Sequence, residues 1–340
     1  MPAKTAPKKG WKDIQSKNRI KKRTRLALIV LGIVLGIIII GWIVKFTQTL
    51  FSPWKFAPAE KSYIWNGEFN INVLIKSKDM ALLSYNPTDK TMTVIRIPDE
   101  VQLEVWGGFG KWQARAIYGL GQLQKMGDGN KLLKRSVGDF FGLPIEGFLQ
   151  FEGQLADKSS QDLTDTLRSK FLGLDLLSNL KTDLTLWELI RLKFGLASVR
   201  FDKVKYLDLA SLGVLDKDFL ADGTAIYTFD PVKIDAVSSK LSDPKIISEH
   251  KTIAVFNSTD YPLIAQKAAR MIANLGGNVI ITGNSEKKLK ETEVFGEESK
   301  TLKRLLQIFN HQRDSKLEPF SSRVLRAQIN VMLGEDFFNR

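Results

Sequence analysis

Residues 252–282, TIAVFNSTDYPLIAQKAARMIANLGGNVIIT, contain one complete strand–helix–strand unit. Residues 252–256 are an apolar run rich in branched side chains, which is typical of a buried strand. Apolar residues then recur at helical spacing over 263–275, and Gly276-Gly277 ends that pattern. Residues 278–282 are a second apolar strand. Because a strand, a helix and a strand in this order form a right-handed crossover, the stretch predicts a parallel pair in an α/β fold.

Polar residues separate the first strand of this unit from its helix. Asn257-Ser258-Thr259-Asp260 has turn chemistry and capping side chains, and Pro262 stands where a first helical turn tolerates a missing N–H. The triplet Asn257-Ser258-Thr259 also fits the N-glycosylation pattern, but a cap for the following helix is the better interpretation. A charged loop at 285–293, a helix near 298–309 and a strand at 327–333 complete a small α/β domain over residues 251–340.

A larger α/β domain is predicted upstream, over residues 66–247. Strands are expected at 69–75, 81–85, 91–97, 145–151 and 199–207, and Asn86-Pro87-Thr88-Asp89-Lys90 has the chemistry of a hairpin turn. Helical spacing marks 113–123, 130–141, 161–172 and 184–194, the last of them capped by Thr182 or Asp183. These elements predict a central mixed sheet. The polar segment 238–251, with a domain boundary near 248, is expected to link the two domains with few contacts.

The N-terminus has the pattern of a membrane anchor. Residues 1–45 contain eleven Lys or Arg and one acidic residue, Asp13, and ten of the eleven precede an uncharged run at 26–44 in which fourteen of nineteen residues are Leu, Ile or Val. Such a run favours membrane insertion by roughly 4 to 8 kcal/mol. The sequence therefore predicts a cytoplasmic basic tail (1–25), a single-pass transmembrane helix (26–44) in the cytoplasmic membrane, a stalk (45–65), and extracytoplasmic domains. Gly32 and Gly36 have the small-xxx-small spacing of a homodimer contact, although such spacings are frequent in any apolar helix.

Composition removes several classes of function. The chain of 340 residues has no cysteine and two histidines, His250 and His311, so thiol chemistry, Cys-type zinc sites and three-histidine metal sites are excluded. The formal charge is +13, but beyond residue 45 the chain holds 50 − 11 = 39 basic and 37 − 1 = 36 acidic residues. Because the excess sits in the tail, nucleic-acid binding is not expected. No P-loop or dinucleotide fingerprint is present.

Two regions resemble the LytR-CpsA-Psr family of bacterial cell-envelope proteins. Residues 252–284 and the run Val331-Met332-Leu333-Gly334-Glu335-Asp336-Phe337 look like the LytR C-terminal domain, in which Asn257, Ser258 and Thr259 occupy the motif turn and Gly334 and Asp336 the closing motif. Residues 82–98 (LLSYNPTDKTMTVIRIP), 111–119 (KWQARAIYG) and 137–153 (VGDFFGLPIEGFLQFEG) resemble, in the right order, three motifs of the family's catalytic-type domain. The resemblance implies an LCP-like domain at 66–247 and a LytR C-terminal domain at 251–340.

Active members of this family look like phosphotransferases that move a glycopolymer from polyprenyl pyrophosphate to peptidoglycan, with arginines, aspartates and a divalent ion around the pyrophosphate. This chain departs from that pattern. Lys76-Ser77-Lys78-Asp79 stands for Arg-Ser-Asp, and Pro98-Asp99-Glu100 stands for Pro-Arg-Asp. The arginine- and aspartate-rich stretch expected within 156–180 is not recognisable.

The remaining candidates each have a structural alternative. Lys76, Lys78, Arg96 and Arg115 are candidates for pyrophosphate binding, or are ordinary surface cations. Candidates for a Mg²⁺ site, required only if the chain is a ligase, are Asp79, Asp99 and Glu100, or these residues are solvated turn formers. Six aromatic residues line a polyprenyl tunnel or belong to the core, and the core is the stronger interpretation: Trp106, Trp112, Phe140, Phe141, Phe148 and Phe151.

Two hypotheses about function follow from the resemblance. The first is a membrane-anchored, extracytoplasmic envelope protein that binds wall glycan, lipid-linked glycopolymer or peptidoglycan with little or no catalysis. The second is an active, divergent phosphotransferase in which Lys76, Lys78 and Arg115 replace the lost arginines. The missing Pro-Arg-Asp favours the first hypothesis. Transcriptional regulation, which the family's older naming suggests, is disfavoured by the predicted extracytoplasmic location.

Overall fold

The computed structural model describes residues 28–29, 31–42, 63–123, 129–169, 179–309 and 327–339. The chain forms two compact units, Met1–Ser52 and Pro53–Arg340. In the first unit residues 31–42 are helical and expose their Leu, Ile and Val side chains. Within the described ranges, no helix combines the length and the apolar character that crossing a membrane requires. The expected span at 26–44 lies partly outside these ranges and stays a prediction.

A six-stranded mixed sheet forms the centre of the second unit, as the sequence predicted. Its order is β7-β6-β1-β2-β3-β8. Strands β1, β2 and β3 are antiparallel neighbours, β6 and β8 run parallel to β1 and β3, and β7 is antiparallel to β6. The strands are β1 (Ile71–Lys76), β2 (Met80–Asn86), β3 (Thr91–Ile97), β6 (Gly147–Phe151), β7 (Leu180–Thr182) and β8 (Val204–Asp208).

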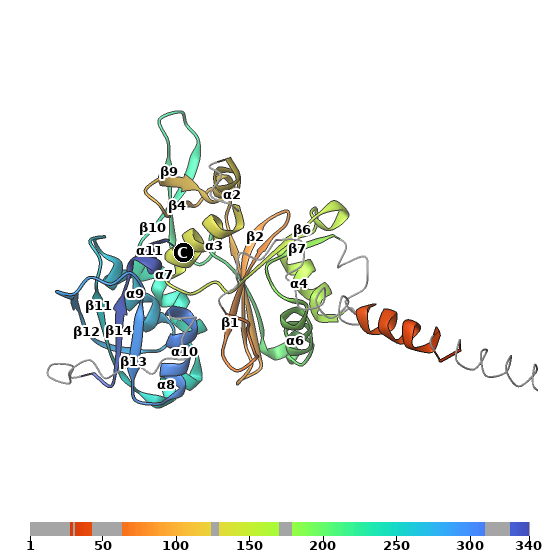
Figure 1. Cartoon of the computed structure of the whole chain (residues 1–340). Helices are drawn as coiled ribbons and strands as arrows, with labels where there is room; N and C mark the ends of the chain where they lie inside the picture. The colour runs from red at the N-terminus through yellow and green to blue at the C-terminus, as the bar shows by residue number, and fades with distance from the viewer. Residues whose placement is uncertain are drawn as a thin grey trace, which may run out of the picture. The chain divides into compact units, whose positions relative to one another are not determined.

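Helices cover both faces of this sheet (Figure 1). Side chains of a strand point alternately to opposite faces, so Leu74 and Leu82 pack with α2 (Ala114–Leu123) and α3 (Gly129–Phe141). Val73 and Leu83 point the other way, into a second core with α4 (Ser160–Ser169) and α6 (Leu186–Ala197). The central strands β1 and β2 are therefore almost entirely buried.

The start of α6 differs from the prediction. The N-cap is Thr185, not Thr182 or Asp183, and a reciprocal capping box joins it to Glu188. The Thr182 hydroxyl instead accepts a hydrogen bond from the N–H of Leu184 at 3.0 Å. Leu184 is the residue before the N-cap. The Glu188 carboxylate also accepts the Trp65 N–H at 2.7 Å. This contact ties the start of the folded body to α6.

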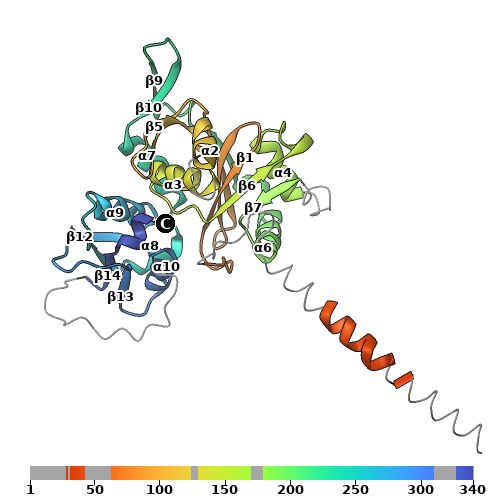
Figure 2. The same ribbon diagram turned by 45° about the horizontal axis from the view of Figure 1, so that its top comes forward.

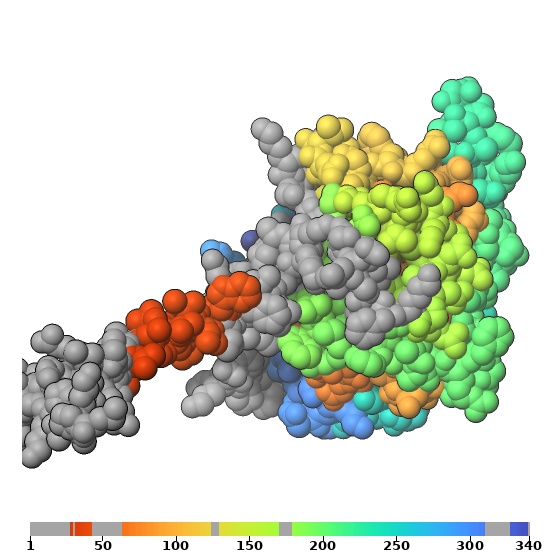
Figure 3. Space-filling model, turned by 90° about the vertical axis from the view of Figure 1, so that its right-hand side faces the viewer, coloured from red at the N-terminus to blue at the C-terminus, as the bar shows by residue number. Residues whose placement is uncertain are grey.

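Two hairpins and a helix were not predicted. β4 (Gln102–Val105) pairs with β5 (Gly110–Gln113), and β9 (Leu215–Phe219) pairs with β10 (Ala225–Phe229) before α7 (Pro231–Ser238). The β9–β10 hairpin stands out from the rest of the body in the ribbon and space-filling views (Figures 1 and 3).

The C-terminal part has its own sheet (Figure 2). This sheet has four strands in the order β12-β11-β14-β13. The predicted parallel pair is confirmed, because β11 runs parallel to both β12 and β14. The helices α9 and α10 share one core with the same face of β11 and β14. The elements are β11 (Thr252–Asn257), α9 (Ile264–Asn274), β12 (Asn278–Asn284), β13 (Glu293–Gly296), α10 (Lys300–Phe309), β14 (Ile329–Leu333) and α11 (Glu335–Asn339).

The predicted cap of the helix after β11 is wrong. α9 begins at Ile264, and its N-cap is Leu263, which has a left-handed backbone (φ 62°) and makes no side-chain cap. The polar turn ahead of it is used differently. Asn257 accepts the Thr259 N–H at 2.9 Å and donates to the Tyr261 carbonyl at 2.8 Å, so its side chain closes the turn rather than the helix.

The segment 238–251 carries more contacts than expected of a linker. It forms α8 (Pro244–Glu249), and Asp243 is buried as the N-cap of that helix. The Asp243 carboxylate also accepts the Asn70 N–H at 2.9 Å, and the Asn70 side chain donates to the Leu241 and Ser242 carbonyls. The segment that suggested a solvated linker thus forms hydrogen bonds to Asn70, the buried residue just before β1.

Candidate functional site

The candidates for phosphate and metal binding gather at one end of the central sheet. Lys76 ends β1, Lys78 and Asp79 form the turn into β2, and β3 ends just before Asp99. Strand pairing sets Lys76 opposite Met80 and Arg96 opposite Ala81. The two cations therefore lie in adjacent cross-strand rows at the same end of the central sheet.

The same register places the two cations on opposite faces. Lys76 shares a face with Met80, which belongs to the core under α2 and α3, whereas Arg96 shares a face with Ala81, which belongs to the core under α4 and α6. The Lys76 ammonium lies 4.8 Å from the centre of the Tyr118 ring on α2. Arg96 forms an ion pair with Asp208 at 2.7 Å and faces Asp79 at 3.7 Å. The two groups therefore do not converge on one ligand position.

Arg115, at the start of α2, lies beside Asp99. Its backbone N–H donates to the Asp99 carbonyl at 3.3 Å, and its guanidinium donates to the Gln113 side chain at 2.9 Å. Burial and the neighbouring Glu100 carboxylate raise the pKa of Asp99, and the positive charge of Arg115 opposes this shift. Lys78 is exposed in the turn.

The acidic candidates do not form a ready metal site. Asp79 already accepts the N–H of Ser160 at the start of α4, at 2.7 Å. Among the described residues, no group of three or more His, Cys, Asp or Glu side chains is arranged to hold a metal ion. A Mg²⁺ site at Asp79, Asp99 and Glu100 remains a prediction.

The motif residues of the C-terminal domain hold backbone segments together. Ser258 donates its N–H to the Leu333 carbonyl at 3.0 Å and so joins the turn after β11 to the end of β14. The Asp336 carboxylate accepts both the N–H and the hydroxyl of Thr292 at 2.7 Å, and the Gly334 N–H donates to that hydroxyl at 3.1 Å. These contacts give the motif a structural role in seating α11.

Most of the aromatic candidates are core residues, as the stronger interpretation held. Phe140, Phe141, Phe148 and Phe151 are at most 3% exposed and pack in the two cores of the sheet. Trp112 is 41% exposed. Trp106 lines a cavity, and its indole N–H donates to the Phe338 carbonyl at 2.8 Å.

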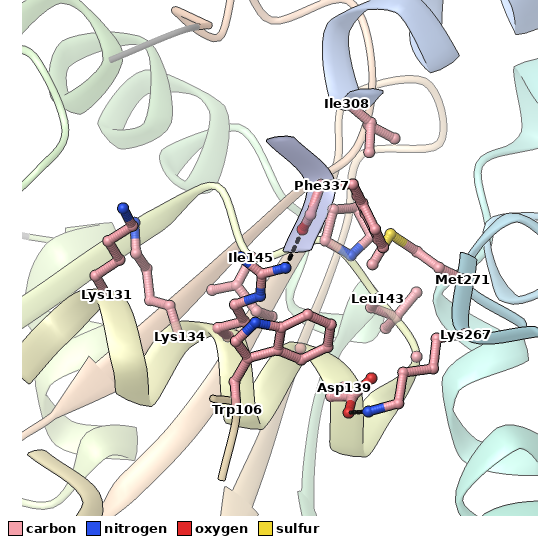
Figure 4. A pocket seen from close by; sticks show the side chains of 14 residues that line it. Trp106, Lys131, Lys134, Asp139, Leu143, Ile145, Lys267, Met271, Ile308 and Phe337 are labelled. Carbon is pink, nitrogen blue, oxygen red and sulfur yellow. Dashed lines mark hydrogen bonds and ion pairs between the residues drawn. The ribbon is translucent and has the colours of Figure 1, made fainter. Parts of the chain in front are cut away.

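That cavity, of about 300 Å³, lies between α3 and the C-terminal domain (Figure 4). Three cations of α3 line it, Lys131, Lys134 and Arg135, and Lys267 of α9 lines it from the other side. The sequence signal was the spacing i, i+3, i+4 of these cations in 130–141, which places them on one helix face. Sequence reasoning used that stretch only as an amphipathic helix and missed the cluster.

Comparison with known proteins places the C-terminal domain in a family. Residues 251–337 match the LytR_C family model, described as "LytR cell envelope-related transcriptional attenuator". No curated protein matches the sequence.

Solved structures with a similar arrangement share little sequence with the chain. TagT bound to LIIa-WTA is 15% identical over 56% of this chain and 97% of its own, with a TM-score of 0.42. TagT of B. subtilis is 16% identical over 53% and 92%, with a TM-score of 0.39. The LytR-CPS2A-psr family protein YwtF (TagT) with bound octaprenyl pyrophosphate lipid is 14% identical over 56% and 97%, with a TM-score of 0.38. These likenesses are too low to assign an activity. The chain thus contains a LytR C-terminal domain at residues 251–337.

Proposed function

We propose that the protein is a membrane-anchored, extracytoplasmic envelope protein that binds an anionic wall glycan or lipid-linked glycopolymer with little or no turnover. The observation that carries the proposal is the division of the cationic candidates: Lys76 and Arg96 lie on opposite faces of the sheet, and Arg96 is paired with Asp208. The LytR C-terminal domain supports a role in the envelope.

The chemistry of pyrophosphate transfer supports the binding role over the catalytic one. The family that the sequence resembles is expected to hold two adjacent phosphates with forked guanidinium donors and a hard cation bound by carboxylates. The Lys76 ammonium is a point charge and cannot make the bidentate contact to phosphate that an arginine guanidinium makes. Each lost bidentate contact costs on the order of 1.5 to 3 kcal/mol, so several losses together slow transfer far more than they weaken electrostatic attraction.

The proposed anchor is the predicted helix at 26–44, with the basic tail in the cytoplasm. Among the described residues, a Cβ placed on Gly32 or Gly36 has no neighbour within 4 Å, which leaves room for a second copy at these positions. Close packing of two anchors through these glycines is the proposed route to a homodimer.

A transfer assay separates the two functions. The full chain in nanodiscs is mixed with labelled lipid-linked glycan, peptidoglycan and Mg²⁺, and transfer and binding are measured in parallel. We expect measurable binding that weakens as salt rises, with little or no transfer. Lys76→Ala with Arg115→Ala is expected to weaken binding, whereas the control Lys205→Ala with Lys240→Ala, which also removes two charges at exposed positions, is not. Robust turnover that the double variant abolishes would establish the phosphotransferase instead.

A further inference from the structure

We propose that the cavity between α3 and the C-terminal domain binds the phosphate group of an anionic ligand through Lys131, Lys134 and Arg135. The inference rests on the proposed function, since it takes the phosphate to belong to an envelope glycan or its prenyl carrier. This cavity is a different site from the end of the central sheet, because the residues that line it do not include Lys76, Lys78, Arg96 or Arg115.

Both parts of the body build the cavity. The α3 wall presents Lys131, Lys134, Arg135 and Gly138, which follow one another along a single helix face. The C-terminal domain closes the opposite side with residues of α9, α10 and α11: Lys267, Met271, Ile308 and Phe337. Figure 4 shows Lys131 and Lys134 on one side of Trp106, and the ion pair of Asp139 with Lys267 on the other. The complete site therefore exists only where the two parts meet.

The charge of the cavity favours an anion. Four cationic residues and one carboxylate, Asp139, line it, a formal balance of 4 − 1 = +3, and the Asp183 carboxylate behind Lys134 reduces this to 3 − 1 = +2. Like charges at i, i+3 and i+4 repel one another on a helix. Burial and the charges of Arg135 and Lys134 lower the pKa of Lys131. A bound phosphate would relieve this repulsion and add charge-assisted hydrogen bonds.

Contacts within the protein hold most of these cations in place and leave one available. Lys134 pairs with Asp183, and Lys267 pairs with Asp139 at 2.5 Å. Arg135 donates to the Phe337 carbonyl, with its guanidinium 3.7 Å from the centre of the Trp106 ring. Within the part of the chain that the structure describes, Lys131 has no hydrogen-bond or ion-pair partner. Lys131 is thus the cation most available to a ligand.

The remaining lining is apolar, which narrows the class of ligand. Leu143, Pro144 and Ile145 follow the end of α3, and Met271 and Ile308 face them from the C-terminal domain. A free phosphate would use only the cationic wall. A phosphate ester with a prenyl chain or a sugar attached would use both walls, so an amphiphilic phosphate fits this cavity best.

The test uses isothermal titration of the full chain in phosphatidylcholine nanodiscs. The probes are inorganic pyrophosphate, farnesyl pyrophosphate and a glycerol phosphate oligomer. We expect Lys131→Ala to weaken binding of the preferred probe about tenfold and Lys131→Glu to weaken it further, since a charge-assisted contact is worth about one such factor. Lys205→Ala is the matched control and is expected to bind as the unaltered chain does. Because each variant relieves the repulsion of Lys131 by Lys134 and Arg135, neither is expected to lower the melting temperature.

Each outcome decides between the sites. Tighter binding of farnesyl pyrophosphate than of the oligomer assigns the prenyl carrier, and the reverse order assigns the glycan. Unchanged affinity in both Lys131 variants, with a loss in the Lys76→Ala, Arg115→Ala variant, would overturn this inference and leave the proposed function intact. Pyrophosphate binding that depends on Lys131, without any glycan binding, would keep the site and overturn the proposed function. An unaltered chain that binds none of the probes would overturn both.

Discussion

Arg304 is fully buried although its guanidinium is permanently charged. It pairs with Glu146, whose side chain is 9% exposed, and donates to the Asn70 carbonyl at 3.0 Å. Glu146 in turn accepts the Asn72 N–H at 2.8 Å. The pair joins α10 of the C-terminal domain to the loop before β6. A buried charge of this kind is costly to leave without its partner.

The first prediction concerns this pair. Glu146→Ala or Arg304→Ala alone is expected to lower the free energy of unfolding by about 3 to 5 kcal/mol, because each leaves one buried charge uncompensated. The double variant Glu146→Leu with Arg304→Met is expected to cost less than either single change, since it removes both charges. Urea unfolding followed by tryptophan fluorescence measures all three variants. Losses that simply add in the double variant would contradict the pairing.

Asp99 gives a pH-dependent prediction. Burial, assisted by the Glu100 carboxylate, raises its pKa in the folded state, so the folded state holds this proton more tightly than the unfolded chain does. The stabilisation from protonated Asp99 is complete below the ordinary Asp pKa and is lost as pH rises through the raised pKa. Asp99→Asn is therefore expected to raise the melting temperature at pH 7, with a gain that disappears in acid.

Thermal unfolding over a pH series checks the effect of Asp99→Asn. The control is Asp222→Asn, because a hydrogen bond from the Thr224 backbone lowers the pKa of Asp222 and its loss is expected to bring no gain. Equal responses of the two variants would show that the environment of Asp99 is ordinary.

At the scale of elements, a strand could be predicted from the sequence only where its apolar residues follow a regular pattern. β3 was found with its observed bounds, Thr91–Ile97, because apolar residues alternate or run together along it. β9 was missed because its sequence, LDKDF, is largely exposed in a projecting hairpin and has no apolar face. β7, with three residues, and β13, within a charged loop, are too short to show a period.

The candidate site could be predicted only in part for a related reason. The sequence identified Lys76, Asp79 and Arg96 as candidates for phosphate or metal binding. The face of the sheet on which each side chain lies depends on the strand register, and a shift of one residue moves a side chain to the other face. The cations of α3 were visible at helical spacing. The cavity that they line depends on packing against the C-terminal domain, which no local pattern contains.

The seating of α11 is predicted to depend on Gly334. A Cβ at this position would lie 2.4 to 2.8 Å from backbone atoms of Glu291. Gly334→Ala is therefore expected to destabilise the chain by about 1 to 3 kcal/mol and to increase amide exchange in α11 and at Thr292. Gly283→Ala in β12 is the control, because its Cβ would meet only Phe256 at an ordinary 3.7 Å. Unchanged exchange in α11 would show that the glycine is not required for close approach.

For the whole molecule, the distribution of charge along the chain is a better guide to the binding of anionic ligands than the net charge. The +13 balance is concentrated before residue 45, and the remainder carries 39 basic and 36 acidic residues. A nearly neutral body has no strong general attraction for polyanions. Selective binding of an anionic ligand must then come from local clusters such as the α3 cations, which lie beside the C-terminal domain.

The same asymmetry predicts the orientation of the chain in the membrane. Basic segments next to a span stay in the cytoplasm, so the tail is expected inside and the folded body outside. Because the chain has no cysteine, a single introduced thiol reports one position without background. Lys205→Cys, at an exposed position of β8, is expected to react with a membrane-impermeant maleimide in intact cells. Ser16→Cys, in the basic tail, is expected to react only after the cells are permeabilised. Labelling of Ser16→Cys but not Lys205→Cys in intact cells would reverse the topology and remove the envelope function proposed for the body.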